Sequence, residues 1–275
     1  MVANNQPKQI SVFDIEGSTN LPELDISDNK LMKNSRHAII GVRKGIVDLW
    51  NAFMVDGAEF APGTDIPICP TTASSHPEGL ISWREAKKLH KREIGRGHKD
   101  YRINAYIHFY IDDQYFDGLF TGIWLHLMRV LKVISHFAGI IAPDFSTYAD
   151  FPDPLVRWNF YRMNAFGYWI GSLGIPVIVN ARWGWPKTWS YCWDGIRPGD
   201  MVAIGTVGSG LKRKINRDQF EQGFDELIRR IHPSVIVVYG SAGHPCFDKA
   251  RAAGIQIVAF PSETSERFAR RCRHE

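Results

Sequence analysis

The sequence lacks the short motifs that identify several common enzyme classes. It contains no GxxxxGK[ST] phosphate loop, no GxGxxG dinucleotide fingerprint, no HExxH zinc motif and no GxSxG nucleophile elbow. Its four cysteines include no CxxC pair. These absences argue against a P-loop nucleotidase, a serine hydrolase of the elbow type and a zinc knuckle. No metal site is therefore predicted, and no cofactor is identified.

Long apolar runs are absent as well. The most apolar stretch, 116–141, is interrupted by His126, Arg129, Lys132 and His136, so we expect no membrane-spanning segment and no membrane partner. The first residues have no apolar segment behind a basic one, so no signal peptide is expected. We expect a cytoplasmic protein whose cysteines are free thiols.

What is present is the composition of an ordinary globular protein. The chain has 275 residues, of which 44% are hydrophobic and 23% are charged. A chain of this length can bury a large core without disulfides. The polar residues 1–36 predict an extended N-terminal arm, and residues 37–275 predict a single α/β domain.

Apolar runs alternate with helical patterns from residue 103 onward. Most of the runs are continuous rather than alternating, which is typical of parallel strands buried on both faces. The predicted strands are 66–69, 105–111, 138–142, 176–179, 201–205, 235–239 and 255–260.

Helical patterns separate these predicted strands. They cover 82–93, 117–136, 154–173, 218–232 and 247–253. Ser82 is the predicted N-cap of the first and Gly174 ends the third. Right-handed β–α units of this kind form either a TIM-barrel-like or incomplete barrel, which we favour, or an open doubly wound sheet.

In both architectures, ligands bind at the carboxyl ends of the strands. Asp144 directly follows predicted strand 138–142, and Asp112 and Asp113 end the 105–111 strand. A carboxylate at such a position is partly desolvated, which suits it to general acid–base or nucleophilic catalysis. We therefore predict these three as catalytic residues; the alternative is that Asp144 caps the next turn.

Substrate-binding candidates follow the later strands. Arg182 lies between Asn180 and Trp183, with Trp185 close by, a combination that suits phosphate binding and base stacking. Packing of the tryptophans in the core is the alternative. Two glycine-rich loops, GTVGSG at 205–210 and GSAG at 240–243, could hold phosphate through backbone amides or simply form tight turns. The remaining candidates lie in these loops or near the start of helix 154–173: Ser146, Asn159, Arg162, Thr206, Gly208, Tyr239, Gly240, Ser241 and His244.

An ordered set of short motifs runs through the middle of the chain. It comprises APDFS at 142–146 with Asp150 and Pro152, then NxYR at 159–162, GIPVI at 174–178, WDG at 193–195, VAIGTVG at 202–208 and VYGS at 238–241. With these motifs, residues 115–245 resemble the domain of unknown function 4417 family, which occurs in phages and other mobile elements. The resemblance implies a mobile-element origin and the cytoplasm of a host cell, and it implies no particular reaction.

Two functional hypotheses remain from the sequence. The first is an enzyme that acts on a nucleotide or nucleic-acid component by glycosyl transfer or hydrolysis. The second is a non-catalytic module that binds nucleic acid or a host protein through its basic segments, 87–99, 212–217 and 267–273. The partner would be a nucleotide-like small molecule in the first case. The oligomeric state is left open.

Overall fold

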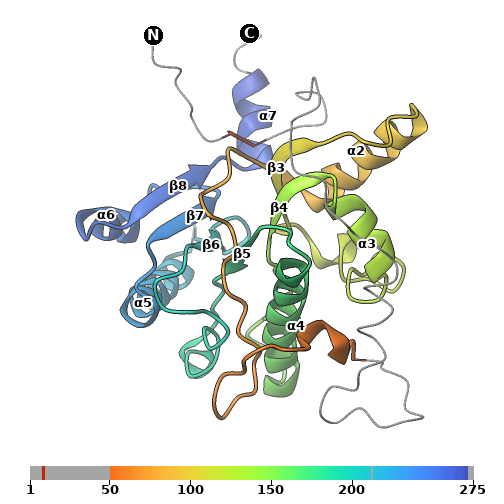
Figure 1. Ribbon diagram of the computed structural model, residues 1–275. Coiled ribbons are helices and arrows are strands. Elements are labelled where there is room, and N and C mark those ends of the chain that lie inside the picture. Colours follow the sequence, from red (N-terminus) through yellow and green to blue (C-terminus); the bar gives the residue numbers. More distant parts are fainter. Residues whose placement is uncertain (1–7, 10–49, 212, 272–275) are drawn as a thin grey trace, which may run out of the picture.

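The computed structural model describes residues 8–9, 50–211 and 213–271. Eight parallel strands form one curled sheet, and their order in the sheet is their order in the chain (Figure 1). The strands are β1 (Lys8–Gln9), β2 (Gly79–Ser82), β3 (Ile103–His108), β4 (Phe137–Ile141), β5 (Val177–Asn180), β6 (Val202–Gly205), β7 (Val235–Tyr239) and β8 (Gln256–Phe260). Apart from β1, the predicted arm 1–36 lies outside the described residues.

Helices surround the sheet, with α5 and α6 on one side and α2 and α3 on the other (Figure 1). They are α2 (Trp83–Gly95), α3 (Leu127–Ile134), α4 (Asp153–Ser172), α5 (Lys214–Ile231), α6 (Pro245–Ala252) and α7 (Glu263–Arg271). Three short 3-10 helices are η1 (Ala52–Val55), η2 (Asp113–Tyr115) and η3 (Pro186–Thr188).

The strand order decides between the two predicted architectures. Each of β1 to β7 pairs in parallel with the strand that follows it in the chain. A doubly wound sheet reverses its strand order at a switch point, and this sheet does not. Within the described residues β8 does not pair with β1. The predicted incomplete barrel is therefore confirmed.

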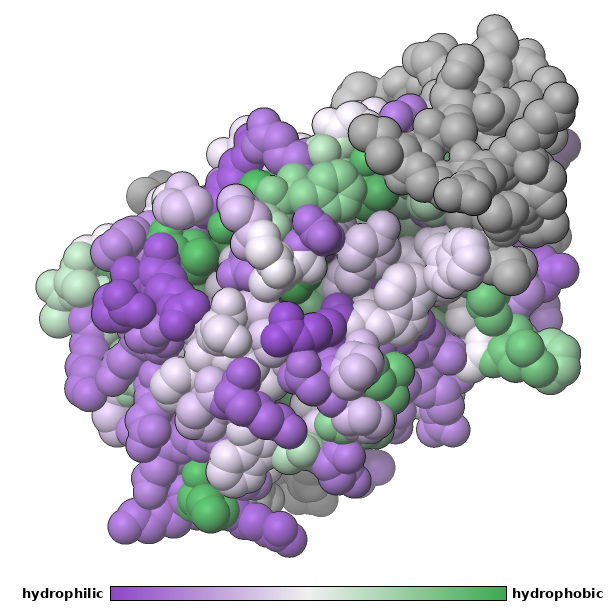
Figure 2. Space-filling view, turned by 90° about the horizontal axis from the view of Figure 1, so that it is seen from below, coloured by the Kyte–Doolittle hydropathy of each residue, from purple (hydrophilic) through white to green (hydrophobic). Residues whose placement is uncertain are grey.

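Side chains of the strands alternate between two cores. On β6, Val202 and Ile204 pack outward against the helices, whereas Ala203 packs inside the curl with Tyr106 and Ile178. Both layers are apolar, which explains why the strands are continuous hydrophobic runs. The face in Figure 2 carries mostly hydrophilic side chains with small scattered hydrophobic groups. No helix of the described residues is both long and apolar enough to cross a bilayer.

Local predictions met different outcomes. The Ser82 hydroxyl accepts a hydrogen bond from the Glu85 amide at 3.4 Å, and Gly174 ends α4 with φ +83°, both as predicted. Three predicted elements differ in the structure. Segment 66–69 is not a strand. It is largely buried but carries only an isolated antiparallel bridge, Phe60–Pro67, because proline lacks the amide hydrogen that a ladder needs. The predicted helix 117–136 is wrong in its first half, because the only helix in this range, α3, covers Leu127–Ile134. Strand 105–111 ends early, at His108.

Candidate functional site

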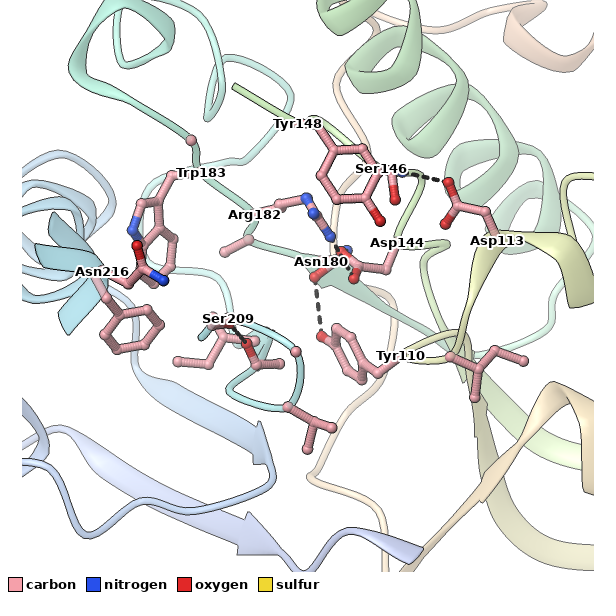
Figure 3. Close-up of a pocket in the computed structure, with 18 of the residues that line it drawn as sticks. Tyr110, Asp113, Asp144, Ser146, Tyr148, Asn180, Arg182, Trp183, Ser209 and Asn216 are labelled. Carbon is pink, nitrogen blue, oxygen red and sulfur yellow. Dashed lines mark hydrogen bonds and ion pairs between the residues drawn. The ribbon is translucent and has the colours of Figure 1, made fainter. Parts of the chain in front are cut away.

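A pocket of about 420 Å³ opens at the carboxyl ends of β3 to β6 (Figure 3). Its walls come from the loops after these strands and from the first turns of α5. Trp183 and Asn216 lie on one side and Asp113 on the other, with Asp144 and Arg182 between them. The polar and aromatic lining residues are Tyr110, Asp112, Asp113, Asp144, Ser146, Tyr148, Asn180, Arg182, Trp183, Ser209, Asn216, Gln219 and Phe220.

Asp144 is held by hydrogen bonds to both of its oxygens. Asn180 Nδ2 donates to Oδ1 at 2.9 Å, and Arg182 Nη1 donates to Oδ2 at 2.6 Å. The Tyr110 hydroxyl donates to Asn180 Oδ1 at 3.0 Å, and Arg182 Nε donates to Thr147 Oγ1 at 2.9 Å. The strand β5 thus supplies the amide and the following loop supplies the guanidinium that fix this carboxylate. Its orientation is set before any ligand binds.

Burial and the Asp144 charge perturb the neighbouring groups. Burial, and then the nearby Asp144, raise the pKa of the Tyr110 hydroxyl well above its ordinary value, so this phenol stays protonated and donates. Burial is the largest single influence on Arg182 and opposes its charge, but the attraction and the hydrogen bond of Asp144, together with the nearby Asp113 and Tyr148, outweigh it and raise the guanidinium pKa. Arg182 and Asp144 form an ion pair at 2.6 Å, which presents a preorganised polar edge to the pocket.

Asp113 occupies a different environment from Asp144. Its Oδ2 accepts a hydrogen bond from the Ser146 amide at 3.3 Å, and no described basic side chain forms an ion pair with it. Burial is the largest influence and raises its pKa, against the opposing hydrogen bonds from Ser146. Asp113 consequently holds a proton to higher pH than an exposed aspartate does. The adjacent Asp112 lines the pocket too, but it is exposed.

Trp183 is wedged against helix α5. Its ring lies 4.9 Å from the Phe220 ring, centroid to centroid, and also contacts Phe224. Gly223 makes this approach possible, because a Cβ there would lie 2.2 Å from the indole. The ring cannot move toward the helix, so it forms a rigid apolar side of the pocket.

The 205–210 loop forms another side. Gly208 (φ +81°) and Gly210 (φ +64°) adopt left-handed backbone that favours glycine. Ser209 Oγ donates to Gly205 O at 3.2 Å, and Asn216 Nδ2 donates to Gly210 O at 3.2 Å, so α5 holds the loop in place. The Thr206 hydroxyl instead donates to the Ser241 carbonyl at 3.1 Å, which joins this loop to the next one outside the pocket.

Two predicted binding residues lie behind the wall and support it. Arg162 makes a bidentate ion pair with Asp117, at 2.6 and 2.8 Å, and donates to Asn159 Oδ1 at 2.6 Å. Asn159 Nδ2 in turn donates to the Ser146 carbonyl. The Arg162 guanidinium also lies 4.0 Å above the Phe145 ring. These buried side chains fix the loop after β4 and do not line the pocket.

The pocket brings together half of the residues predicted from strand ends. Those that line it are Asp112, Asp113, Asp144, Ser146, Asn180, Arg182, Trp183 and Gly208. Besides Asn159 and Arg162, those that do not line it are Trp185, Thr206, Tyr239, Gly240, Ser241 and His244. Tyr239 faces the inside of the curl, stacked with Tyr110 at 5.5 Å, and the loop after β7 turns away from the cavity.

Several lining residues were not predicted from the sequence. Tyr110 lies within predicted strand 105–111, and Tyr148 belongs to none of the patterns that mark site residues. Asn216, Gln219 and Phe220 lie on α5, and only the i, i+3, i+4 spacing of these three could have indicated a shared face. Among the described residues, no group of three His, Cys, Asp or Glu side chains could hold a metal ion.

Comparison with known proteins gives the following matches. The model of the family described as "Domain of unknown function (DUF4417)" matches residues 58–261. A protein named "Gene 1 protein" from Mycobacterium phage L5 is 34% identical over 149 residues, which are 54% of this chain and 63% of that protein. The "Gene 1 protein" of Mycobacterium phage D29 is 32% identical over 179 residues, 64% of this chain and 60% of that protein. The chain thus aligns with less than two thirds of either relative. No solved structure matches it significantly.

Proposed function

The chain belongs to the DUF4417 family, as its ordered motifs predicted, and we propose that it is an enzyme acting on a nucleotide or nucleic-acid component by glycosyl transfer or hydrolysis. The observation that carries this proposal is a pair of carboxyl groups in one pocket with contrasting environments. Asp144 accepts hydrogen bonds from a guanidinium and an amide, whereas burial raises the pKa of Asp113. Carboxyl pairs of this kind divide acid and nucleophile roles in glycosidic chemistry.

Each carboxyl group has a distinct role in this scheme. Protonated Asp113 is the general acid, which donates its proton to the departing base as the glycosidic bond breaks. Asp144 faces the positive charge that develops on the sugar, and either bonds to the sugar carbon as a nucleophile or stabilises the charge while water or an incoming base bonds there. If Asp144 bonds first, water or an incoming base then displaces it, and the proton of the incoming group passes to the Asp113 carboxylate. Tyr110 and Asn180 act through Asp144 by holding its orientation.

The other walls suit the remaining parts of a nucleotide. The pocket volume, about 420 Å³, lies in the range of small-molecule sites. Trp183 and Phe220 offer an apolar surface for a planar base, and the amides of Asn216 and Gln219 can form hydrogen bonds with the edge of a base. Arg182 and the 205–210 loop provide cationic and backbone N–H groups for a phosphate.

The test is release or exchange of a base, measured by liquid chromatography and mass spectrometry after incubation with nucleotides and with DNA and RNA oligonucleotides. We expect turnover by the wild type, and a loss of at least about 100-fold for Asp113→Asn and for Asp144→Asn. Asp150→Asn is the matched control, because it removes an exposed carboxylate that does not line the pocket. Substrate binding with no turnover by the wild type would contradict the enzymatic function and leave a binding module.

A further inference from the structure

The loop between β3 and α3 presents two apolar side chains to solvent. Leu119 is 71% exposed and Phe120 is 85% exposed. Their turn is nonetheless tightly hydrogen-bonded: the Thr121 hydroxyl donates to Gln114 O at 2.8 Å and accepts from the Gly118 amide at 3.2 Å. The side chains are therefore displayed on an ordered turn.

The base of this turn is closed and anchored in the core. Ile123 N donates to Phe116 O at 2.7 Å, and both of these side chains are fully buried. The bidentate ion pair of Asp117 with Arg162 fixes the same point to helix α4. A constrained turn loses little conformational entropy when its tip is buried by a partner, so it is suited to insertion.

A strongly basic segment, made of helix α2 and the five residues after it, lies beside this loop. Residues 83–100 contain seven lysine and arginine side chains and three acidic ones, and this net +4 equals the formal net charge of the whole chain. Lys87 Nζ donates to Tyr115 O at 3.1 Å, and the Arg84 guanidinium lies 5.3 Å from the centre of the Tyr115 ring. These contacts join α2 to the connection that also contains Asp113 of the pocket.

We propose that residues 118–122 form a wedge for nucleic acid. Phosphates of the strand contact α2, while Leu119 and Phe120 insert between stacked bases and leave one base free to enter the pocket. A base inside a duplex cannot reach the Asp113 and Asp144 carboxyl groups at the strand ends, so it must first leave the stack. Apolar wedges flanked by basic residues are a general means of unstacking bases. The base-accepting role of the pocket rests on the proposed function.

The wedge is connected to the pocket through buried side chains. Asp117 at the base of the turn pairs with Arg162, Arg162 bonds Asn159, and Asn159 bonds the Ser146 carbonyl. Ser146 N then donates to Asp113. These hydrogen bonds join the turn to the loop that positions the proposed general acid.

The test uses DNA duplexes carrying 2-aminopurine, whose fluorescence rises when the base is unstacked. We expect the wild type to raise the fluorescence and the Leu119→Ala/Phe120→Ala variant to lose at least about 80% of this rise, with an unchanged melting temperature because both side chains are exposed. Ile215→Ala, at a residue that is 64% exposed on α5, is the matched control and keeps the signal. An equal rise for the wedge variant would overturn the proposal.

Binding and catalysis are separated by a second measurement. Fluorescence anisotropy with labelled DNA should show affinity that falls steeply with salt, and Lys88→Glu/Lys91→Glu should weaken it by at least about 10-fold. Unstacking of the DNA without release of a base would contradict the proposed enzymatic function and support the wedge proposal. Release of a base from free nucleotides, with no binding of duplex DNA, would contradict the wedge proposal and support the proposed enzymatic function. If the wedge variant changes sedimentation instead, the turn is an interface between copies of this chain.

Discussion

Individual side chains in the pocket show how environment separates chemically identical groups. Asp113 and Asp144 are both aspartates in loops that follow strands, yet Asp113 accepts hydrogen bonds from Ser146, whereas Asp144 accepts them from a guanidinium and a side-chain amide. The difference comes from Asn180 and Arg182, which β5 and its following loop place opposite Asp144. Position in the fold, and not residue type, assigns the proposed roles.

The raised pKa of Asp113 predicts a pH-dependent effect of Asp113→Asn on stability. A carboxyl group whose folded-state pKa is above its unfolded value stabilises the fold at low pH, and this contribution is lost as pH rises through the folded pKa. The melting temperature of the variant relative to wild type should therefore increase between pH 4 and pH 7. Calorimetry across this range tests it, with Asp112→Asn as control. A difference that falls with pH would contradict the assignment.

At this scale the sequence predicted the carboxylates and their immediate partners better than the more distant Tyr110. Asp144, Asn180 and Arg182 were found because each follows an apolar run, and parallel strands bring such ends together. Tyr110 was missed because its aromatic ring resembles the strand residues before it. His244 and Ser241 satisfy the same strand-end pattern, but the loop after β7 turns away, and sequence spacing does not encode the direction of a loop.

Helix α5 serves both the core and the pocket. Its buried face packs Phe224 and Leu227 against the sheet, while its first turns bring Asn216 and Gln219 to the cavity. Gly223 lets Trp183 lie against this helix. One element thus sets the position of the aromatic wall.

Gly223→Ala should displace the Trp183 ring. The new methyl group would lie 2.2 Å from the indole, so the ring must shift, and we expect a loss of about 1–3 kcal/mol in stability with altered tryptophan fluorescence. Gly95→Ala at the end of α2 meets nothing within 4 Å and is the control, expected to be neutral or slightly stabilising. Urea unfolding followed by fluorescence measures both. Equal stabilities of the two variants would show that Gly223 is not required.

Element boundaries were predictable where periodicity was long. The amphipathic pattern identified α5, although it placed the start at 218 rather than Lys214. β2 was missed because Leu80 and Ile81 are its only large apolar residues, and the first half of helix 117–136 was wrong because Gly118 and Gly122 form a turn there. Short or glycine-interrupted segments depend on tertiary contacts that local pattern does not contain.

The whole molecule should lose stability as pH falls below about 6.5. Burial lowers the pKa of His108 to about 3, and burial also lowers those of His90 and His136. These groups bind protons more readily when unfolded, so each can cost up to about 1.4 kcal/mol per pH unit between its folded and unfolded pKa. Urea unfolding from pH 7.5 to 5 measures the slope, and His108→Asn should make it shallower. A flat profile for wild type would contradict this.

The sequential strand order also bears on how the protein is made. Every strand pairs with the one synthesised just before it, so a nascent chain leaving the ribosome can add one β–α unit at a time to an existing edge. All residues that line the pocket lie between Tyr110 and Phe220. The stretch of chain that supplies every lining residue is therefore synthesised before β7 and β8.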